Sequence, residues 1–144
     1  AKDVIDIQVT VESLEVADAL AGSLADIGLP RLDRITGDNP HAGDGARWGK
    51  RFHASADPGR LAHVHLRVDG WPGQRYALIF RDWLRADPQV RGEYLEVKRL
   101  AERTAQESPQ DTAAYVEAKE PWFAQAYPRA LAWADETGWT PATS

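Results

Sequence analysis

The stretch "AHVHLRV", residues 62–68, alternates apolar and polar side chains along its whole length. This period of two predicts a β-strand with one apolar and one polar face. Val64, Leu66 and Val68 would face a hydrophobic core, whereas the residues between them include two of the four histidines in the chain. The role of those histidines therefore depends on what the polar face of this strand meets.

The preceding residues 47–55, "RWGKRFHAS", form the predicted partner strand of a β-hairpin. Pairing Phe52 with Val64 brings the apolar side chains of both strands to one side, and Asp57-Pro58-Gly59 then forms a three-residue loop. This register predicts that the following side chains share one polar face: Arg51, His53, His63, His65 and Arg67.

Strict alternation in "VIDIQVTV", residues 4–11, predicts another half-buried strand. Its polar residues Asp6, Gln8 and Thr10 would join the same polar face. We expect one core to hold apolar residues of all the strands and of the helical segment that follows them: Ile5, Ile7, Phe52, Val64, Leu66, Ile79 and Phe80.

Helical periodicity occupies residues 13–27, with Ser13 as the N-cap, and returns in most of the second half of the chain. Asp87-Pro88 begins one of the later helices and Asp111 another. Strands that precede helices predict a single α+β domain over residues 1–144. We expect a small mixed or antiparallel sheet with helices packed on one face, followed by a helical C-terminal half.

Composition narrows the possible functions. The net charge of −5 argues against generic binding to nucleic acid or to an anionic membrane surface, which requires a basic excess. The absence of cysteine excludes disulfides, thiol catalysis and cysteine-ligated metal. No apolar run approaches the roughly 20 residues of a membrane span, and no export signal is visible, so we expect a cytoplasmic protein.

The predicted polar face has three interpretations. A solvated sheet face is the commonest in antiparallel sheets, and the pattern alone favours it. A metal site could use His63 and His65 with Asp6, since zinc accepts such ligands. The arginines, however, favour an anion, because guanidinium groups match phosphate geometry and a metal is disfavoured beside them.

We therefore predict weak binding of phosphate, sulfate or a nucleotide phosphate at this face. Protonated imidazoles would add donors, so binding should be tighter at about pH 6 than at about pH 8. Arg81 and Arg85, one helical turn apart in the "FRDWLRA" segment, could add positive charge.

Several segments resemble the GrpB family. The most specific is "RYALIFRDWLRADP" at residues 75–88, which is followed by Tyr94 with Lys98 and by Tyr115 with Lys119. "AKDVIDI" at the start of the chain is similar to the family's "AKPIIDI", and "HVHLRV" is similar to its "HLHV" strand. The resemblance implies a divergent nucleotidyltransferase-like fold. It also implies a relation to actinobacterial proteins in which a GrpB domain is fused behind dephospho-coenzyme A kinase.

Two departures from the nucleotidyltransferase pattern bear on activity. Active members hold Mg²⁺ with two carboxylates spaced two residues apart on one strand, but the corresponding positions here are Asp6 and Gln8. The family's Gly-Ser segment lies upstream of "AKPIIDI", so we expect the chain to be a fragment that lacks it. We therefore expect no catalytic residues, with Asp6 and Gln8 as a degenerate pair.

The resemblance implies an accessory domain of a dephospho-CoA kinase, an ATP-dependent transferase of coenzyme A biosynthesis, with the kinase domain as its partner in the same polypeptide. No G-x-x-x-x-G-K-[ST] motif is present, so the chain cannot itself be that kinase. The candidate cofactors are Mg²⁺ and a nucleotide. The alternatives are a stand-alone nucleotidyltransferase with an upstream Gly-Ser loop and a protein-interaction module.

Overall fold

The computed structural model describes residues 4–107 and 113–142. It contains two compact units, Ala1–Arg75 and Tyr76–Ser144, and each is described by itself. The predicted helix start at Asp111 lies outside the described residues. The α+β class is confirmed, because the described strands all lie in the first unit and the second unit is helical in its described part.

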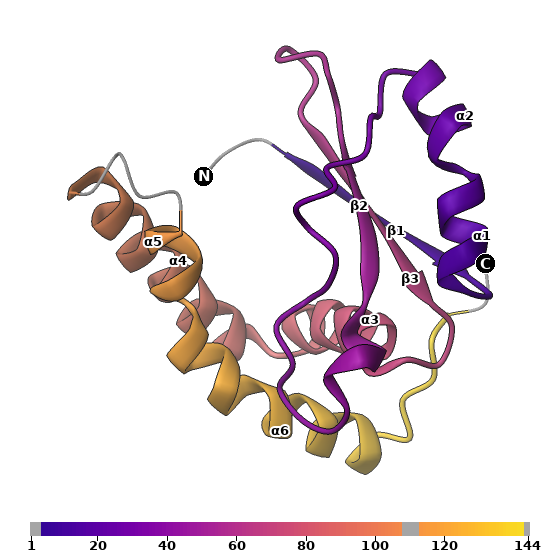
Figure 1. The fold of residues 1–144 in the computed structure, drawn as a ribbon. Coiled ribbons are helices and arrows are strands. Elements are labelled where there is room, and N and C mark those ends of the chain that lie inside the picture. Colours follow the sequence, from indigo (N-terminus) through magenta and orange to yellow (C-terminus); the bar gives the residue numbers. More distant parts are fainter. Residues whose placement is uncertain (1–3, 108–112, 143–144) are drawn as a thin grey trace. The chain divides into compact units, whose positions relative to one another are not determined.

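The first unit is built on a three-stranded mixed sheet (Figure 1). The strands are β1 (Ile5–Val11), β2 (Lys50–Ala54) and β3 (Ala62–Val68), in the order β1-β3-β2. β1 runs parallel to β3, and β2 runs antiparallel to it. The sequence "AHVHLRV" is therefore the central strand, and its predicted alternation is confirmed: Val64, Leu66 and Val68 are buried.

Helices α1 (Leu14–Ala19) and α2 (Ala21–Asp26) cover one face of the sheet (Figure 1). The Ser13 hydroxyl accepts a hydrogen bond from the Val16 amide at 3.3 Å, which confirms the predicted N-cap. Two short helices replace the one helix that was predicted. Their apolar side chains, together with those of β1 and β3, form the core of this unit: Val11, Leu14, Ala17, Leu24, Leu29, Val64, Leu66, Val68 and Trp71.

The predicted hairpin register is wrong by one residue. Phe52 pairs with His65 and not with Val64, and His53 pairs with Val64 and not with His63. The covered face accepts a polar residue because His53, which is fully buried, donates from Nδ1 to the Leu29 carbonyl oxygen at 2.8 Å. Phe52 is buried on the opposite face, so it does not join the core with Leu66.

The edge strand β1 also departs from the prediction. Ile5 and Ile7 lie on the same side of the sheet as Val64 and Leu66, yet both are exposed. The cover of α1 and α2 buries Val64, Leu66 and Val68 of the central strand, whereas the edge strand is covered only in part. Between α2 and β2 the chain forms a long loop, as predicted, that ends in the short 3₁₀ helix η1 (Gly45–Trp48).

Helix α3 (Pro72–Ala86) runs from the first unit into the second, which also contains α4 (Pro88–Glu107), α5 (Ala114–Glu117) and α6 (Glu120–Glu136). The Asp87 carboxylate accepts hydrogen bonds from the amides of Gln89 and Val90, at 2.9 and 3.2 Å, which confirms the predicted start of α4. Aromatic rings pack between the helices: Phe80 lies 5.2 Å from Tyr94, and Trp122 stacks on Tyr94 at the same distance.

Truncation of the central strand should test this account of the core. Leu66 is fully buried, so Leu66→Ala should lower the free energy of unfolding by about 2–5 kcal/mol, the range for removing a buried leucine side chain. Denaturant unfolding measures the change. Leu61→Ala, at a position that is 42% exposed just before β3, is the matched control and should change stability little. An equal loss in the two variants would contradict the placement of the core.

Candidate functional site

The face of the sheet opposite α1 and α2 carries the candidate site. The strand register aligns Asp6 with His63, Gln8 with His65 and Thr10 with Arg67 across β1 and β3. Across β2 and β3 it aligns Lys50 with Arg67 and Phe52 with His65. We call this set of side chains, together with Asp38 from the loop before β2 and Gln74 from α3, the polar sheet face.

A nearly buried ion cluster lies at one end of this face. The Asp38 carboxylate accepts two hydrogen bonds from the Arg67 guanidinium, at 2.7 and 2.9 Å, and a third from Lys50 Nζ at 2.5 Å. The side chains of Lys50 and Arg67 are only 8% and 11% exposed. Charges this far from water are stable only when paired, so Asp38 supplies a counter-charge that both cations share, without which they would be strongly unfavourable here.

The electrostatics follow from this geometry. Burial alone would raise the pKa of Asp38, but the hydrogen bonds and charges of Arg67 and Lys50 outweigh it and hold that pKa below its ordinary value of 3.8. Burial lowers the pKa of the Lys50 ammonium, and the neighbouring Asp38 carboxylate offsets this only in part. Phe52 adds a ring 5.7 Å from Lys50 Nζ.

Gln8 lies at the centre of the polar sheet face. Its Oε1 accepts a hydrogen bond from Arg67 Nη1 at 2.8 Å, and its Nε2 donates to the Gln74 carbonyl oxygen at 3.3 Å. Gln74 also donates to the Thr10 hydroxyl and accepts from the Gly70 amide. The Gln8 amide is therefore held on both sides, and a carboxylate at this position could not donate the hydrogen bond to the Gln74 carbonyl oxygen.

Asp6 faces the two histidines of β3. Its Oδ1 lies 3.4 Å from His63 Nδ1 and 3.5 Å from His65 Nε2. The hydrogen bond with His65 is the main cause that lowers the pKa of Asp6. Burial lowers the pKa of His65, and the charges of Arg67 and Lys50 add to this effect, so His65 stays neutral down to a lower pH than an exposed histidine. The predicted tighter binding of anions at about pH 6 requires protonated histidines. A lowered pKa makes His65 less protonated at that pH, which works against the prediction.

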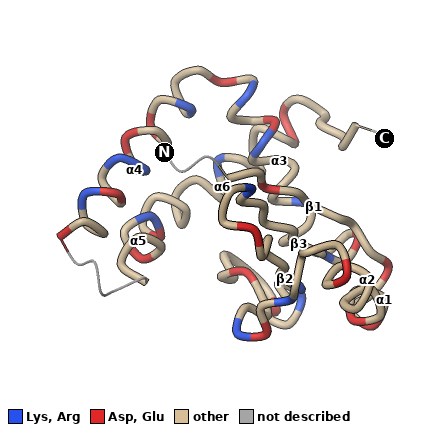
Figure 2. Tube along the Cα trace, turned by 90° about the horizontal axis from the view of Figure 1, so that it is seen from above, with Lys and Arg blue, Asp and Glu red and all other residues tan. Residues whose placement is uncertain are grey.

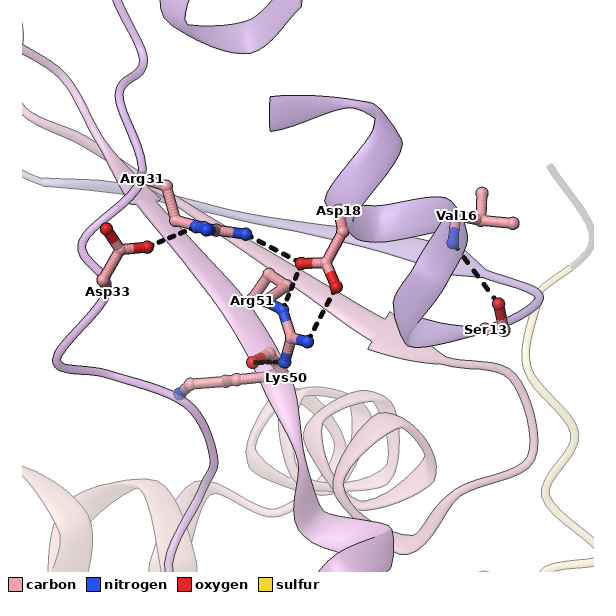
Figure 3. A network of polar contacts seen from close by, with 7 residues as sticks. All are labelled: Ser13, Val16, Asp18, Arg31, Asp33, Lys50 and Arg51. Carbon is pink, nitrogen blue, oxygen red and sulfur yellow. Dashed lines mark hydrogen bonds and ion pairs between the residues drawn. The ribbon is translucent and has the colours of Figure 1, made fainter. Parts of the chain in front are cut away.

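Two of the predicted anion ligands lie on the other face of the sheet. Arg51 pairs with Leu66 in the ladder and reaches α1, where it donates to both carboxylate oxygens of Asp18, at 2.6 and 2.9 Å (Figure 3). Arg31 donates to the same carboxylate at 2.7 Å. His53 is fully buried and is hydrogen-bonded to Leu29, in the segment that follows α2. The one-residue error in register is the reason for both corrections, because it moves every β2 side chain to the opposite face.

The network around Asp18 borders a groove of about 440 Å³, which Arg31, Asp33 and Thr36 also line. Asp33 accepts a hydrogen bond from Arg31 at 2.5 Å. The two arginines are thus matched by two carboxylates, and the network serves to attach α1 and the loop after α2 to β2. We regard the polar sheet face as the better candidate site.

Arg81 and Arg85 belong to the second unit, and their position relative to the polar sheet face is not determined. Arg81 donates to both carboxylate oxygens of its neighbour Asp82, at 2.8 and 3.1 Å, and Arg85 lies 3.6 Å from the same carboxylate. Trp139 Nε1 also donates to Asp82. Along α4, basic and acidic residues alternate and form no single basic stripe (Figure 2).

The residues of the polar sheet face do not fit a divalent cation. Asp6 is the one carboxylate that β1 presents, and Gln8 is already hydrogen-bonded. The neighbouring strand β3 contains no Asp or Glu and places the Arg67 guanidinium beside Gln8. Within residues 4–107 and 113–142, no three His, Asp or Glu side chains come together as metal ligands. No step can therefore be assigned to a metal on this face.

Three residues of the site were missed by sequence reasoning: Asp38, Lys50 and Gln74. Lys50 could have been found from strand alternation. Lys50 and Phe52 are two residues apart in β2, and in the correct register both lie on the face that carries Arg67. Asp38 lies in an irregular loop and Gln74 in the first turn of a helix, and strand periodicity contains no information on either.

Comparison with known proteins places this geometry in a class. The structure is similar to the crystal structure of the conserved protein GrpB from Enterococcus faecalis, with a TM-score of 0.61 and 25% identity over 91% of this chain and 71% of that one. The fold is accordingly nucleotidyltransferase-like, with a small mixed sheet. The model of the GrpB protein family matches residues 1–129, and the chain belongs to that family.

The curated relatives are longer proteins. A dephospho-CoA kinase of Mycolicibacterium paratuberculosis is 57% identical over 98% of this chain, and one of Mycobacterium tuberculosis is 54% identical over 98%. The chain spans 37% of the length of each of them. The resemblance to GrpB and to the fused kinases, drawn from short motifs, is thereby confirmed. In the described part of the chain, no helix combines the length and the apolar character that crossing a membrane requires.

The ion cluster yields a prediction about stability. Asp38→Asn keeps the shape of the side chain but leaves Arg67 and Lys50 without a counter-charge. It should lower the free energy of unfolding by about 3 kcal/mol, the lower end of the range for breaking a buried ion pair, because Asp38 is partly accessible. Asp33→Asn, at a side chain that is 78% exposed, is the control and should have little effect.

The pH dependence gives a second readout of the same cluster. Since the pKa of Asp38 is lowered in the folded state, its contribution is complete above its ordinary value of 3.8 and is lost as the pH falls further. Urea unfolding of the wild type should therefore show a loss of stability below about pH 4 that is smaller in Asp38→Asn. Identical acid profiles for the two proteins would contradict this role of Asp38.

Proposed function

We propose that this chain is the GrpB domain of a dephospho-CoA kinase and that it acts as an accessory domain without transfer chemistry of its own. The high identity to two such kinases over nearly the whole chain supports this placement. The matched part is little more than a third of each relative, so the larger part of those proteins lies outside the region of similarity. The kinase domain, ATP and the coenzyme A precursor belong to that larger part in this proposal.

The observation that carries the non-catalytic role is the state of Gln8. In a metal-dependent nucleotidyltransferase, this position and Asp6 would together hold the cation. Here Gln8 accepts a hydrogen bond from Arg67, whose positive charge is itself held by Asp38. A fixed guanidinium next to the position of the missing carboxylate repels a divalent cation and stabilises the face without one.

The test is an assay of the chain and of its Asp6→Asn variant. We expect neither protein to phosphorylate dephospho-coenzyme A with ATP, and neither to turn over nucleoside triphosphates with Mg²⁺. In the full-length M. tuberculosis kinase, a substitution at the position aligned with Asp6 should leave kcat/KM unchanged, whereas deletion of the GrpB region should lower the yield and melting temperature of the folded enzyme. Mg²⁺-dependent nucleotidyl transfer that disappears in Asp6→Asn would instead support the stand-alone nucleotidyltransferase.

Binding of phosphate or nucleotide stays a proposal for the polar sheet face, through Arg67, Lys50, His63 and His65. Asp38 is hydrogen-bonded to both Arg67 and Lys50, so an incoming anion would have to compete with its carboxylate. Calorimetry with ATP should therefore show weak binding to the wild type and tighter binding to Asp38→Asn, in which both cations are released. Arg67→Ala is the control and should abolish the heat in either background. If ATP bound to none of these proteins, the ion cluster would have only a structural role. That result would favour the alternative of a protein-interaction module.

The cytoplasm as the location, and the absence of nucleic acid and membrane partners, are further parts of this proposal. Their support is the net charge of −5 and the mixed charges of the surface helices.

A further inference from the structure

The first turn of α3 lies against the ion cluster of Asp38, Arg67 and Lys50. Gly73, the second residue of α3, is buried at this point. A Cβ atom at position 73 would lie 3.1 Å from Asp38 Oδ2, 3.6 Å from the Trp48 ring and 3.9 Å from Arg67 Nε. The Asp38 carboxylate therefore rests on helix backbone, at a position where even a methyl group would crowd it.

The backbone conformation does not explain why residue 73 is glycine. The described glycines with positive φ are Gly28, Gly43, Gly70 and Gly138, so Gly73 has a conformation that other residues adopt. A glycine in a helix is less favourable than an alanine, because it loses more conformational freedom on folding. The close approach of the Asp38 carboxylate is the feature that explains glycine at this position.

Asp38 has little freedom to move away from an added side chain. Its amide donates to the Trp48 carbonyl oxygen at 2.9 Å, and the Lys50 amide donates to the Thr36 carbonyl oxygen at 2.8 Å, so the loop is bonded to residues 48–50. Both carboxylate oxygens are also engaged, since Oδ1 accepts from Lys50 Nζ and Arg67 Nη2 and Oδ2 accepts from Arg67 Nε. Any displacement by a methyl group at position 73 would distort at least one of these hydrogen bonds.

The Asp38 carboxylate occupies the position at which an external anion would bind. Arg67 donates to both of its oxygens, and this forked geometry is the one in which a guanidinium group binds carboxylate or phosphate. Lys50 adds a second cation to the same carboxylate. An internal carboxylate of this kind lowers the apparent affinity for any other anion, because the cations are available in only a fraction of the molecules.

We propose that Gly73 is the residue that keeps the polar sheet face closed to external anions. Its lack of a side chain leaves the space in which Asp38 binds Arg67 and Lys50, so Gly73 acts through Asp38 as a positioning residue. A larger side chain at position 73 opens the face without changing the net charge. The inference deepens the proposed binding of anions and rests on it, whereas the effect of Gly73 on Asp38 is independent of any ligand.

One substitution in two backgrounds tests the contact between Gly73 and Asp38. In the wild type, Gly73→Ala should lower the urea midpoint of unfolding, because the added methyl group displaces the carboxylate. In the Asp38→Ala variant it should raise the midpoint, because the carboxylate is gone and alanine is the better helix residue. Gly22→Ala, in α2 of the same unit, is the matched control: a Cβ atom there meets nothing within 4 Å, so it should raise the midpoint in both backgrounds. A change of the same sign for Gly73→Ala in both backgrounds would overturn the proposal.

A second measurement uses Gly73→Ala alone and does not require that Asp38→Ala folds. The Arg67 Nε–H group donates to Asp38 Oδ2 at 2.7 Å, so we expect its proton to exchange slowly with water. In Gly73→Ala the Arg67 Nε–H signal in the NMR spectrum should shift, and its exchange at neutral pH should become faster. In Gly22→Ala both should match the wild type. A slow and unshifted signal in Gly73→Ala would mean that residue 73 does not position Asp38, and the proposal would fail.

Calorimetry with ATP connects this contact to binding. The affinity of Gly73→Ala should lie between that of the wild type and that of Asp38→Asn, although Gly73→Ala leaves the net charge unchanged. Addition of Arg67→Ala to Gly73→Ala should abolish the heat. If Asp38→Asn bound ATP more tightly than the wild type and Gly73→Ala did not, the role of Gly73 would be overturned and the proposed anion site would stand. If ATP bound to neither variant, both proposals would be overturned, so the two failures are distinguishable.

Discussion

The carboxylate of Asp38 is the group on which the polar side of the sheet depends. It accepts hydrogen bonds from both Arg67 and Lys50, and it thereby connects the loop before β2 to strands β2 and β3. Without it, two adjacent cations of like charge would be removed from water side by side. With it, Arg67 is fixed in a position from which its remaining nitrogen binds Gln8. The arrangement of the candidate site is therefore a consequence of satisfying one buried negative charge.

The same ion cluster explains why the polar face of this nucleotidyltransferase-like fold does not require a divalent cation. A site built for a divalent cation concentrates negative charge, and the carboxylates repel one another until the metal arrives. On the polar sheet face, the two cations Arg67 and Lys50 are matched in number by the carboxylates of Asp38 and Asp6. The amide of Gln8 and the imidazole of His65, whose pKa is lowered by burial, add no negative charge. Such a face needs no ion for its stability. This is the physical content of the proposal that the domain supports a kinase and performs no transfer itself.

Sequence periodicity located the strands, the N-cap at Ser13 and the start of α4 at Asp87, because these depend on neighbours a few residues away. The pairing of β2 with β3 was predicted on the assumption that Phe52 must share a face with Val64. That assumption failed because the covered face provides the Leu29 carbonyl for His53 and the Asp18 carboxylate for Arg51. Both partners come from other elements, and no local pattern reveals them. Arg67 lies on the polar face with His63 and His65, as the alternation predicts, whereas its partner Asp38, 29 residues earlier, formed no part of that prediction.

The parallel pairing of β1 with β3 also has a consequence for how the chain reaches this structure. Each residue of β1 pairs with a residue 57 positions later, from Ile5 with Ala62 to Val11 with Val68, whereas β2 and β3 are joined by a short connection. Closing so long a loop is unfavourable until the contacts at its ends form together. During synthesis the β1 segment leaves the ribosome well before its partner strand exists. The β2–β3 hairpin can therefore form first, and docking of β1 onto β3 becomes the late step that joins the two ends of this unit.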